Sequence, residues 1–175
     1  MAVVIITMKY HRDGKIEYLK NALRYLKYNK DGEIREDLRY IGGKYVRDPW
    51  DVNKSFYNMM TIKRFFNKTG NNPLLHLIIA LDYKYGNDIK NVIEYGDLLC
   101  DYFDKFQTVY CIHEKEHEGG KYHIHLIINA SSYVDGKIMN VHYTLFTEFE
   151  RYVMNVIGLN KYEIKTVNMI YNENH

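Results

Sequence analysis

Three histidines stand in a segment that is otherwise typical of two β-strands. His123 and His125 are separated by one apolar residue, and His113 ends a second apolar stretch upstream. Because side chains alternate between the two faces of a strand, His123 and His125 share one face. Neutral imidazole is the commonest protein ligand for a divalent metal, and three protein ligands leave a coordination position open for substrate. The spacing therefore predicts a catalytic metal site formed by His113, His123 and His125.

The histidines are expected on a β-hairpin. Two strands are predicted, at residues 108–113 and 122–129, joined by a charged turn that contains two adjacent glycines. In the registers that this turn allows, His113 falls opposite His123 or His125 and projects to the same side of the sheet. A His-x-His pair alone is better explained as two polar residues on a wet sheet face. The third histidine and a wholly apolar opposite face favour the metal site; that opposite face carries Tyr122, Ile124, Leu126 and Ile128.

Cysteine, the other common zinc ligand, is scarce in the chain. Its two cysteines, Cys100 and Cys111, form no closely spaced pair of the kind found in zinc ribbons or redox motifs. Cys111 shares the face of His113, so a thiolate ligand is an alternative, but a small buried strand residue is the favoured interpretation. His76 lies in a separate apolar run and is interpreted as a satisfied sheet histidine. A structural zinc domain is disfavoured.

Apolar periodicity predicts the elements that position these residues. Strands are expected at residues 2–10, 74–83, 108–113, 122–129 and 162–171. Helices are expected at residues 16–29, 51–67, 88–106 and 143–157, with Gly158 as a C-cap. Residues 33–50 are predicted as a loop or short hairpin. The fold class is therefore α+β, with a central, mainly antiparallel β-sheet of about five strands and flanking helices.

Length and composition predict a single domain spanning residues 1–175, since 46% hydrophobic residues are typical of a globular protein. The longest apolar runs are too short to span a membrane, and the N-terminal segment lacks the basic region and cleavage site of a signal peptide. We therefore expect a cytoplasmic protein without a membrane partner.

Charge is distributed unevenly along the chain. Lys and Arg minus Asp and Glu gives 15 − 8 = +7 over residues 1–72 and 9 − 14 = −5 over residues 73–175. A basic half beside a half rich in His and carboxylates suits a polyanion that one part holds and the other cuts. Residues 33–50 interleave cations with aromatic rings, as single-strand surfaces do. On charge alone, a solvated basic surface or a mobile loop explains these patterns equally well.

These motifs together resemble the HUH endonucleases, and among them the plasmid-mobilisation relaxases. The resemblance covers most of the chain, and its motifs are the hairpin IHEKEHEGGKYHIHLIIN, the strand LHLII, the helix ALRYLKYNKDG and the segment SSYVDGKIM. It implies the HUH-endonuclease (relaxase) fold and a metal-dependent, site- and strand-specific DNA endonuclease and strand transferase that acts in plasmid or mobile-element mobilisation and conjugation. It also implies single-stranded or hairpin DNA at an origin of transfer, accessory mobilisation proteins, and one divalent ion. The ion is Mn²⁺ or Mg²⁺, with Zn²⁺ as an alternative.

The resemblance also assigns the nucleophile. Without it, a tyrosine on the first helix is interpreted as a half-buried packing residue. By the likeness, Tyr25 attacks the scissile phosphate to form a 5′-phosphotyrosine and a free 3′-hydroxyl, and Tyr28 is the alternative one turn on. Because tyrosine has a pKa near 10, the metal or a nearby carboxylate such as Glu114 or Glu116 is expected to assist.

Several cations and one asparagine are expected to bind DNA. The residues expected to contact DNA are Arg24, Lys27, Arg35, Arg39, Lys44, Arg47 and Asn129. The loop that precedes His123 is longer than the shortest family versions, which leaves Glu116 or His117 as alternative third ligands. The chain ends at His175, so it is expected to be either a nuclease-domain fragment or a minimal protein.

Two other functions stay open at this point. A rolling-circle replication initiator shares the His-x-His chemistry, and Tyr162 with Lys165 matches its Tyr-x-x-Lys spacing. That segment has the pattern of a strand, whereas such a tyrosine normally lies on a helix. A non-catalytic DNA-binding module that keeps the fold but no longer nicks DNA is the other alternative.

Overall fold

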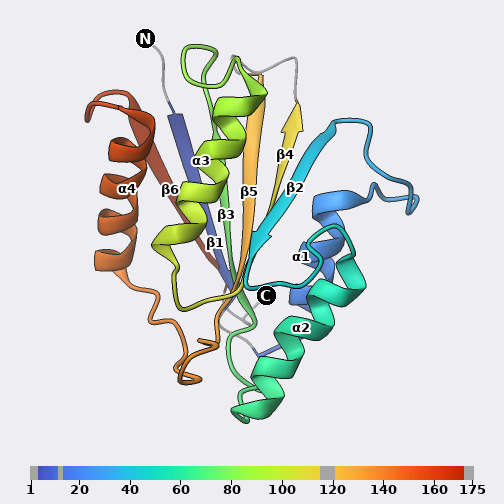
Figure 1. The fold of residues 1–175 in the computed structure, drawn as a ribbon. Coiled ribbons are helices and arrows are strands. Elements are labelled where there is room, and N and C mark those ends of the chain that lie inside the picture. Colours follow the sequence, from blue (N-terminus) through green and yellow to red (C-terminus); the bar gives the residue numbers. More distant parts are fainter. Residues whose placement is uncertain (1–3, 12–13, 115–120, 172–175) are drawn as a thin grey trace.

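A six-stranded sheet forms the centre of the molecule, with helices on both faces (Figure 1). The computed structural model describes residues 4–11, 14–114 and 121–171. The strands are β1 (Val4–His11), β2 (Leu38–Lys44), β3 (Leu74–Ala80), β4 (Thr108–Glu114), β5 (Tyr122–Asn129) and β6 (Ile164–Tyr171). The helices are α1 (Glu17–Lys27), α2 (Val52–Phe65), α3 (Ile89–Tyr102) and α4 (Tyr143–Ile157). The strand order is β2-β4-β5-β3-β1-β6.

Neighbouring strands pair antiparallel except at one edge, where β1 and β6 run parallel. The predicted α+β class with a mainly antiparallel sheet is therefore confirmed. Each predicted helix is present, and Gly158 ends α4 in the left-handed conformation with φ of 78°, as its interpretation as a C-cap requires. None of the helices in the described ranges is long and apolar enough to cross a membrane.

Helices α3 and α4 cover one face of the sheet. Along β5, the side chains that point to this face are buried in the larger hydrophobic core, as the alternating pattern predicts; they are Tyr122, Ile124, Leu126 and Ile128. Phe149 and Val153 of α4 and Leu99 of α3 enter the same core. This half of the molecule is therefore an apolar layer between the sheet and two helices.

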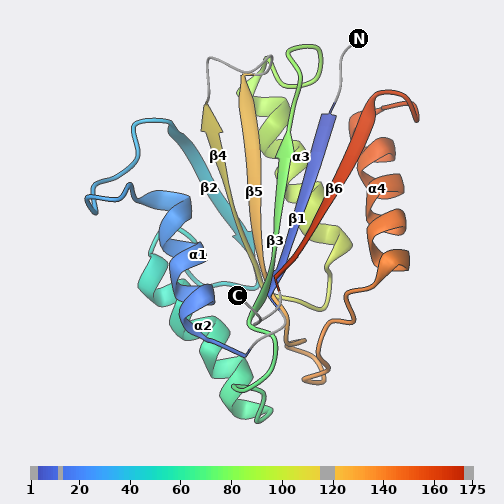
Figure 2. The ribbon, with the colours of Figure 1, turned by 180° about the vertical axis from the view of Figure 1, so that it is seen from behind.

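Helices α1 and α2 cover the opposite face beside β2, β4 and β5 (Figure 2). The predicted stripe of Leu19, Leu23 and Leu26 is at most 1% exposed and belongs to the same core as Val109 and Ile127 of the sheet. This packing lays α1 across the strands that carry the histidines. The residues of α1 that flank the stripe therefore lie beside the histidine face.

Strand β2 was missed by the sequence interpretation, which predicted a loop or short hairpin over residues 33–50. The strand pairs with β4, so the sheet has six strands instead of about five. Its adjacent glycines resemble a turn signal, but a Cβ at Gly42 would lie only 2.6 Å from the ring of Tyr110. Gly42 therefore allows close packing on a ring of the neighbouring strand, a contact that local sequence does not reveal.

Candidate active site

The histidine hairpin has one of the predicted registers. His113 of β4 lies directly opposite His123 of β5, and His125 lies opposite Cys111. On its other side, His125 faces Ile78 of β3. The prediction that all three histidines share one sheet face is confirmed, and all three side chains are at most 9% exposed.

A fourth histidine joins this group from β3. The Nε2 atom of His76 lies 3.4 Å from Nδ1 of His125, and the two ring centroids are 5.7 Å apart. The His113 ring lies on the other side, with its centroid 4.8 Å from that of His125. The sequence predicted His76 to be a satisfied histidine within the sheet. Its burial agrees with that prediction, but its contact with His125 was not predicted. The missing information was strand order, because β3 pairs with β5 only in the folded sheet.

Tyr25 projects from α1 onto this group. Its ring centroid lies 5.6 Å from that of His125, 6.2 Å from that of His113 and 6.3 Å from that of His76. The residue is nevertheless 42% exposed. The structure thus joins an accessible phenol to a buried imidazole cluster.

Tyr28 has different surroundings, although it is only one turn further along. It is the C-cap of α1 and has extended backbone angles. Its ring lies under two cations, 5.5 Å from the Arg24 guanidinium carbon and 5.3 Å from the Lys27 ammonium. The end of the helix therefore places Tyr28 beside Arg24 and Lys27, and within the described part of the chain its ring makes none of the histidine contacts that Tyr25 makes.

The protonation of the cluster follows from its burial. Desolvation lowers the pKa of His125 well below its usual range, and the neighbouring His76 and His113 lower it further. His125 is therefore a neutral imidazole near pH 7. Its buried Nε2 has no hydrogen-bond partner among the described residues. Leaving a buried polar atom without a partner costs free energy, which suggests a site shaped for a ligand.

His113 is oriented by the helix that carries Tyr25. Its Nε2 lies 2.8 Å from the carbonyl oxygen of Leu26, which can only accept a hydrogen bond. Nε2 must therefore carry the proton, which places the lone pair of the neutral ring on Nδ1. Metal-binding histidines are commonly held in this way, with one nitrogen donating to a carbonyl and the other facing the ion.

The donor chemistry fits a divalent ion, although the side chains are not arranged as a finished site. In the parts of the chain that the structure describes, no group of three or more His, Cys, Asp and Glu residues is placed to hold a metal ion. Neutral His125 with its buried Nε2 is nevertheless a suitable donor. Burial raises the pKa of the Cys111 thiol well above its usual value, which disfavours the thiolate alternative. Glu116 and His117, the alternative third ligands, lie outside the described residues.

A fixed cation covers the Tyr25 ring. The Arg35 guanidinium carbon lies 4.9 Å from the ring centroid, and Arg35 donates two hydrogen bonds to Asp37, at 2.9 and 2.8 Å. These bonds raise the pKa of Arg35 and lower the pKa of Asp37, which is also lowered by nearby His113. Sequence reasoning selected Arg35 as a DNA contact but missed Asp37, whose place beside His113 depends on the pairing of β2 with β4.

Glu114, predicted to assist Tyr25, does not join the cluster. Successive strand residues point to opposite faces, so Glu114 points away from the face of His113. Its carboxylate lies 2.5 Å from Nε of Arg39 in an ion pair. The prediction for Glu114 is wrong for this reason, and Glu116 lies outside the described residues. Arg39 is likewise engaged with a protein carboxylate.

Three other predicted DNA contacts have structural partners. Lys27 is 6% exposed, and its ammonium donates to the carbonyl oxygen of Trp50 at 2.9 Å. Asn129 is fully buried and donates to the Met59 carbonyl and the Gln107 side chain. Lys44 lies 2.5 Å from Asp101 of α3, on the face opposite the histidines. Burial contradicts the predictions for Lys27 and Asn129, whose partners are distant in sequence. Lys44 is partly exposed in a surface ion pair, and its DNA contact stays a prediction.

The other predicted cations lie on the α1 and α2 side. Arg24, Tyr25 and Arg35 line a hollow of about 880 Å³ beside the cluster. Arg47 lines a separate hollow of about 500 Å³ together with Tyr57. Arg24 and Arg35 therefore line the same hollow as the candidate nucleophile.

Tyr162, the alternative nucleophile, lies in the turn before β6 and is 66% exposed. In the sheet order, β3 and β1 separate β6 from β5. The turn position fits the objection that such a tyrosine normally lies on a helix. The geometry therefore favours Tyr25.

Comparisons with known proteins bear on the family and the fold of the chain. The family model described as "Relaxase: MobA/VirD2-like, nuclease domain" matches residues 28–157, a segment that begins just after Tyr25. The chain resembles a solved structure described as "Molecular Basis of Vancomycin Resistance Transfer in Staphylococcus aureus", with 14% identity and a TM-score of 0.57. The alignment covers 94% of this chain and 98% of that chain. Similarity at this level shows a shared fold.

A more distant similarity is to a metal-bound structure of the conjugative relaxase TrwC in complex with oriT DNA. The identity is 11%, the TM-score is 0.45, and the alignment covers 87% of this chain and 66% of that chain. This likeness is too weak to support an argument. No curated protein matches the chain.

Proposed function

The chain belongs to the MobA/VirD2-like relaxase nuclease-domain family, and on this premise we propose that it is a metal-dependent, site- and strand-specific DNA endonuclease and strand transferase with Tyr25 as its nucleophile. The substrate is single-stranded or hairpin DNA at the origin of transfer of a plasmid or another mobile element. The observation that carries the proposal is the contact of the exposed Tyr25 ring with three buried imidazoles, at centroid distances of 5.6 to 6.3 Å. An accessible phenol beside proton acceptors and metal donors suits phosphoryl transfer.

In this reaction the Tyr25 Oη attacks the phosphorus atom of a phosphodiester. The Oη–P bond forms and the P–O3′ bond breaks. One DNA fragment is then joined to Tyr25 through its 5′-phosphate, and the other ends in a free 3′-hydroxyl. The phenolic proton must leave Tyr25, and the 3′ oxygen must gain one. We assign both transfers to solvent water, which reaches Tyr25 because this residue is 42% exposed. Because the ester conserves the energy of the phosphodiester, a 3′-hydroxyl can reverse the reaction and rejoin the strand.

Two features of the protein prepare the phenol. The guanidinium of Arg35 lies over the Tyr25 ring and stabilises negative charge as it develops on the oxygen. Asp37 holds that guanidinium through two hydrogen bonds, so little reorganisation is needed during the reaction. Arg35 and Asp37 thus replace Glu114 in the role expected for a carboxylate near the site.

The metal ligands in this proposal are His113, His123 and His125, with Mn²⁺ or Mg²⁺ as the ion and Zn²⁺ as the alternative. When bound, such an ion polarises the scissile phosphate and neutralises charge on its oxygens. The hydrogen bond from His113 to the Leu26 carbonyl supports this assignment, because metal-binding histidines are commonly oriented by such a bond. It also links the ligand directly to the helix of the nucleophile.

The proposal is tested by incubating the protein with single-stranded oligonucleotides from candidate origins and Mn²⁺. Denaturing gels should show one cleaved strand with a free 3′-hydroxyl, and peptide mass spectrometry should find the 5′ fragment attached to Tyr25. Binding without cleavage or adduct would instead identify a non-catalytic DNA-binding module. An adduct on Tyr162 would identify the replication-initiator chemistry.

A further inference from the structure

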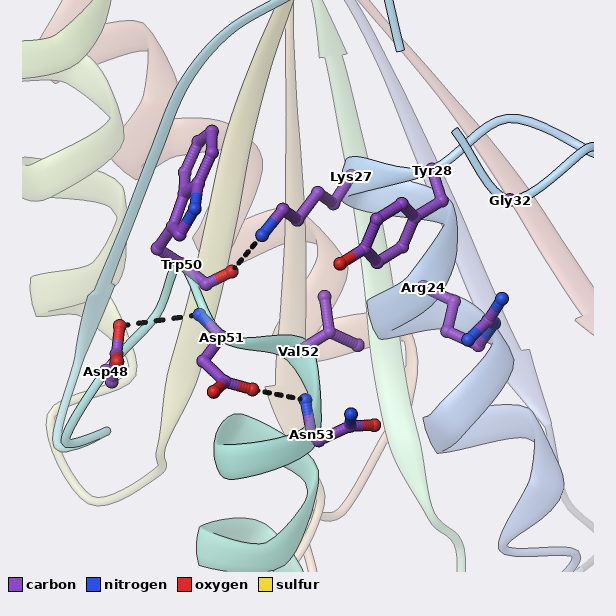
Figure 3. A pocket seen from close by; sticks show the side chains of 9 residues that line it. All are labelled: Arg24, Lys27, Tyr28, Gly32, Asp48, Trp50, Asp51, Val52 and Asn53. Atoms are coloured by element: carbon purple, nitrogen blue, oxygen red, sulfur yellow. Dashed lines mark hydrogen bonds between the residues drawn. The ribbon is translucent and has the colours of Figure 1, made fainter. Parts of the chain in front are cut away.

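A second hollow, of about 540 Å³, lies where the end of α1 meets the start of α2 (Figure 3). It is lined by Arg24, Lys27, Tyr28, Gly32, Asp48, Trp50, Asp51, Val52 and Asn53. It shares Arg24 and Tyr28 with the hollow that contains Tyr25. The two hollows are therefore adjacent at the end of α1.

One wall of the hollow is an exposed aromatic surface. Trp50 is 49% exposed, although its carbonyl is held by the Lys27 ammonium at 2.9 Å. The same ammonium lies 4.2 Å from the Trp50 ring centroid and 5.3 Å from that of Tyr28 (Figure 3). Lys27 thus fixes two rings in place at the end of α1. Fixed, exposed rings are the surfaces on which single-stranded nucleic acids stack their bases.

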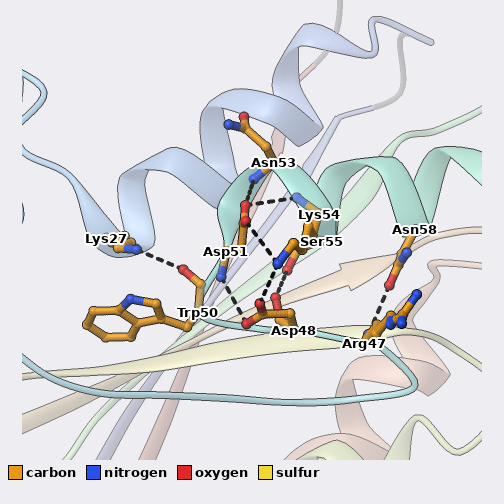
Figure 4. Close-up of polar contacts among 9 residues, drawn as sticks. All are labelled: Lys27, Arg47, Asp48, Trp50, Asp51, Asn53, Lys54, Ser55 and Asn58. Carbon is orange, nitrogen blue, oxygen red and sulfur yellow. Dashed lines mark hydrogen bonds and ion pairs between the residues drawn. The ribbon is translucent and has the colours of Figure 1, made fainter.

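The same side of the hollow, at the start of α2, is rich in hydrogen-bond acceptors. Asp51 caps α2 by accepting from the backbone N–H groups of Asn53 and Lys54, and the Lys54 ammonium lies 3.1 Å from Asp48 (Figure 4). The carboxylate of Asp51 therefore already occupies the helix N-terminus, which disfavours a phosphate there. Both carboxylate side chains are 38% exposed, and a carboxylate has about four acceptor sites, so both can accept further hydrogen bonds.

The outer rim offers a cation. Arg24 is exposed and lies over the Tyr28 ring at 5.5 Å. Within the described ranges, no carboxylate forms an ion pair with Arg24. The hollow thus has a phosphate-binding group on the α1 side, and acceptors and an aromatic platform on the α2 side (Figure 3). This arrangement suits a nucleotide whose base lies between the two sides while its backbone stays at the rim.

We propose that this hollow binds one nucleobase of the DNA strand held at Tyr25, a base with an exocyclic amino group. The base stacks on Trp50, its amino edge faces Asp48 and Asp51, and its phosphate lies near Arg24. The inference rests on the proposed function for the presence of a DNA strand. It adds a base-reading subsite on the α2 side of the nucleophile.

The test uses the wild-type protein without metal, so that no strand is cut. Trp50 is the only tryptophan of the chain, and its fluorescence therefore reports on this hollow alone. Short oligomers of dC and of dT and an abasic deoxyribose-phosphate oligomer are titrated at the same salt concentration. Saturable quenching should be tightest with dC, weaker with dT and absent with the abasic chain. Equal quenching by dC and dT, quenching by the abasic chain, or no quenching would each overturn the proposal.

Variants then measure the contribution of stacking. Trp50→Ala should weaken binding of a labelled dC oligomer by roughly 5- to 150-fold, the range for loss of one stacked base, and Trp50→Phe should recover part of it. Tyr162→Ala, which removes an exposed ring elsewhere, is the matched control and should change nothing. Circular dichroism confirms that the variants are folded. An unchanged affinity in Trp50→Ala would contradict the stacking.

The two proposals can fail separately. The Tyr25→Phe variant should lose cleavage while oligomers quench its Trp50 fluorescence as in the wild type. Cleavage by the wild type without quenching would overturn the base subsite alone. Quenching without cleavage would overturn the nuclease proposal alone.

Discussion

The two faces of β5 are equally buried but differ in chemistry. Toward α3 and α4, Leu126 and its neighbours are apolar members of the larger core. Toward α1 and α2, His125 and Asn129 are also almost inaccessible, at 3% and 0% exposure. Asn129 is satisfied by protein groups, whereas Nε2 of His125 has no partner in the described part of the chain. Hydrogen-bond satisfaction, more than burial, therefore separates a structural polar residue from a candidate ligand.

The largest expected effect follows from the histidine side. His125→Leu fills similar space but removes the donor, so affinity for Mn²⁺ should fall by about 100-fold or more, because even loss of a group that supports a ligand costs roughly 10- to 100-fold. Cleavage should fall with it. Calorimetry with Mn²⁺ and the oligonucleotide assay measure the two effects, and retained affinity would exclude His125 as a ligand.

Leu126, the next residue along β5, should affect stability and leave metal binding unchanged. Leu126→Ala creates a cavity in the apolar core and should lower the free energy of unfolding by about 2–5 kcal/mol, with metal affinity unchanged in the folded protein. Denaturant titration measures the loss. If His125→Leu were destabilised as much as Leu126→Ala, the two faces would not be as distinct as we describe.

A buried lysine on the α2 side is a second polar group whose hydrogen bonds are satisfied by the protein. Lys63 of α2 is fully buried, and its ammonium donates to Ser131 Oγ at 3.0 Å and to the Asn72 carbonyl at 3.2 Å. Burial lowers the pKa of Lys63 from 10.5 to about 8. Between these values the unfolded chain binds more protons, so the free energy of unfolding should rise with pH by up to about 3 kcal/mol. Below the folded pKa both states are charged and this contribution is constant.

Lys63→Met is the matched control for this prediction. Urea titrations of both proteins at about pH 8 and about pH 10 isolate the lysine, because the other titrating groups are common to the two proteins. The wild type should gain stability relative to the variant as the pH rises. An identical pH dependence in the two proteins would show that the lysine has the same pKa in the folded and unfolded states.

The smallest expected effect compares two cations on α1. Arg24→Gln should weaken single-strand binding several-fold and reduce the salt slope by about 0.7, the contribution of one phosphate contact. Lys27→Gln should leave that slope unchanged, because its ammonium is buried against Trp50. Anisotropy titrations over a range of salt concentrations distinguish the two. A lower slope only in Lys27→Gln would reverse the assignment.

Local pattern was sufficient for part of this site. The alternation along the hairpin predicted the shared face of His113, His123 and His125, because strand geometry depends on neighbouring residues. The stripe of Leu19, Leu23 and Leu26 likewise predicted the buried side of α1. Tyr25 as nucleophile came from the resemblance to relaxases.

What the sequence did not reveal depends on distant contacts. His76 reaches His125 only because β3 pairs with β5, and Asp37 reaches His113 only because β2 pairs with β4. Lys27 was taken for a DNA contact because its partner, the carbonyl of Trp50, is remote in sequence. Composition can therefore identify candidate cations, whereas their engagement with protein groups is fixed by tertiary packing.

The most direct test of the central claim compares two tyrosines one helical turn apart. Tyr25→Phe and Tyr28→Phe each remove only a hydroxyl, so both variants should fold and bind the origin strand nearly as the wild type does. We predict that strand cleavage and the covalent adduct detected by intact-protein mass spectrometry vanish in Tyr25→Phe and persist in Tyr28→Phe. An adduct that persists in Tyr25→Phe would contradict the claim that the tyrosine beside the histidine cluster is the nucleophile.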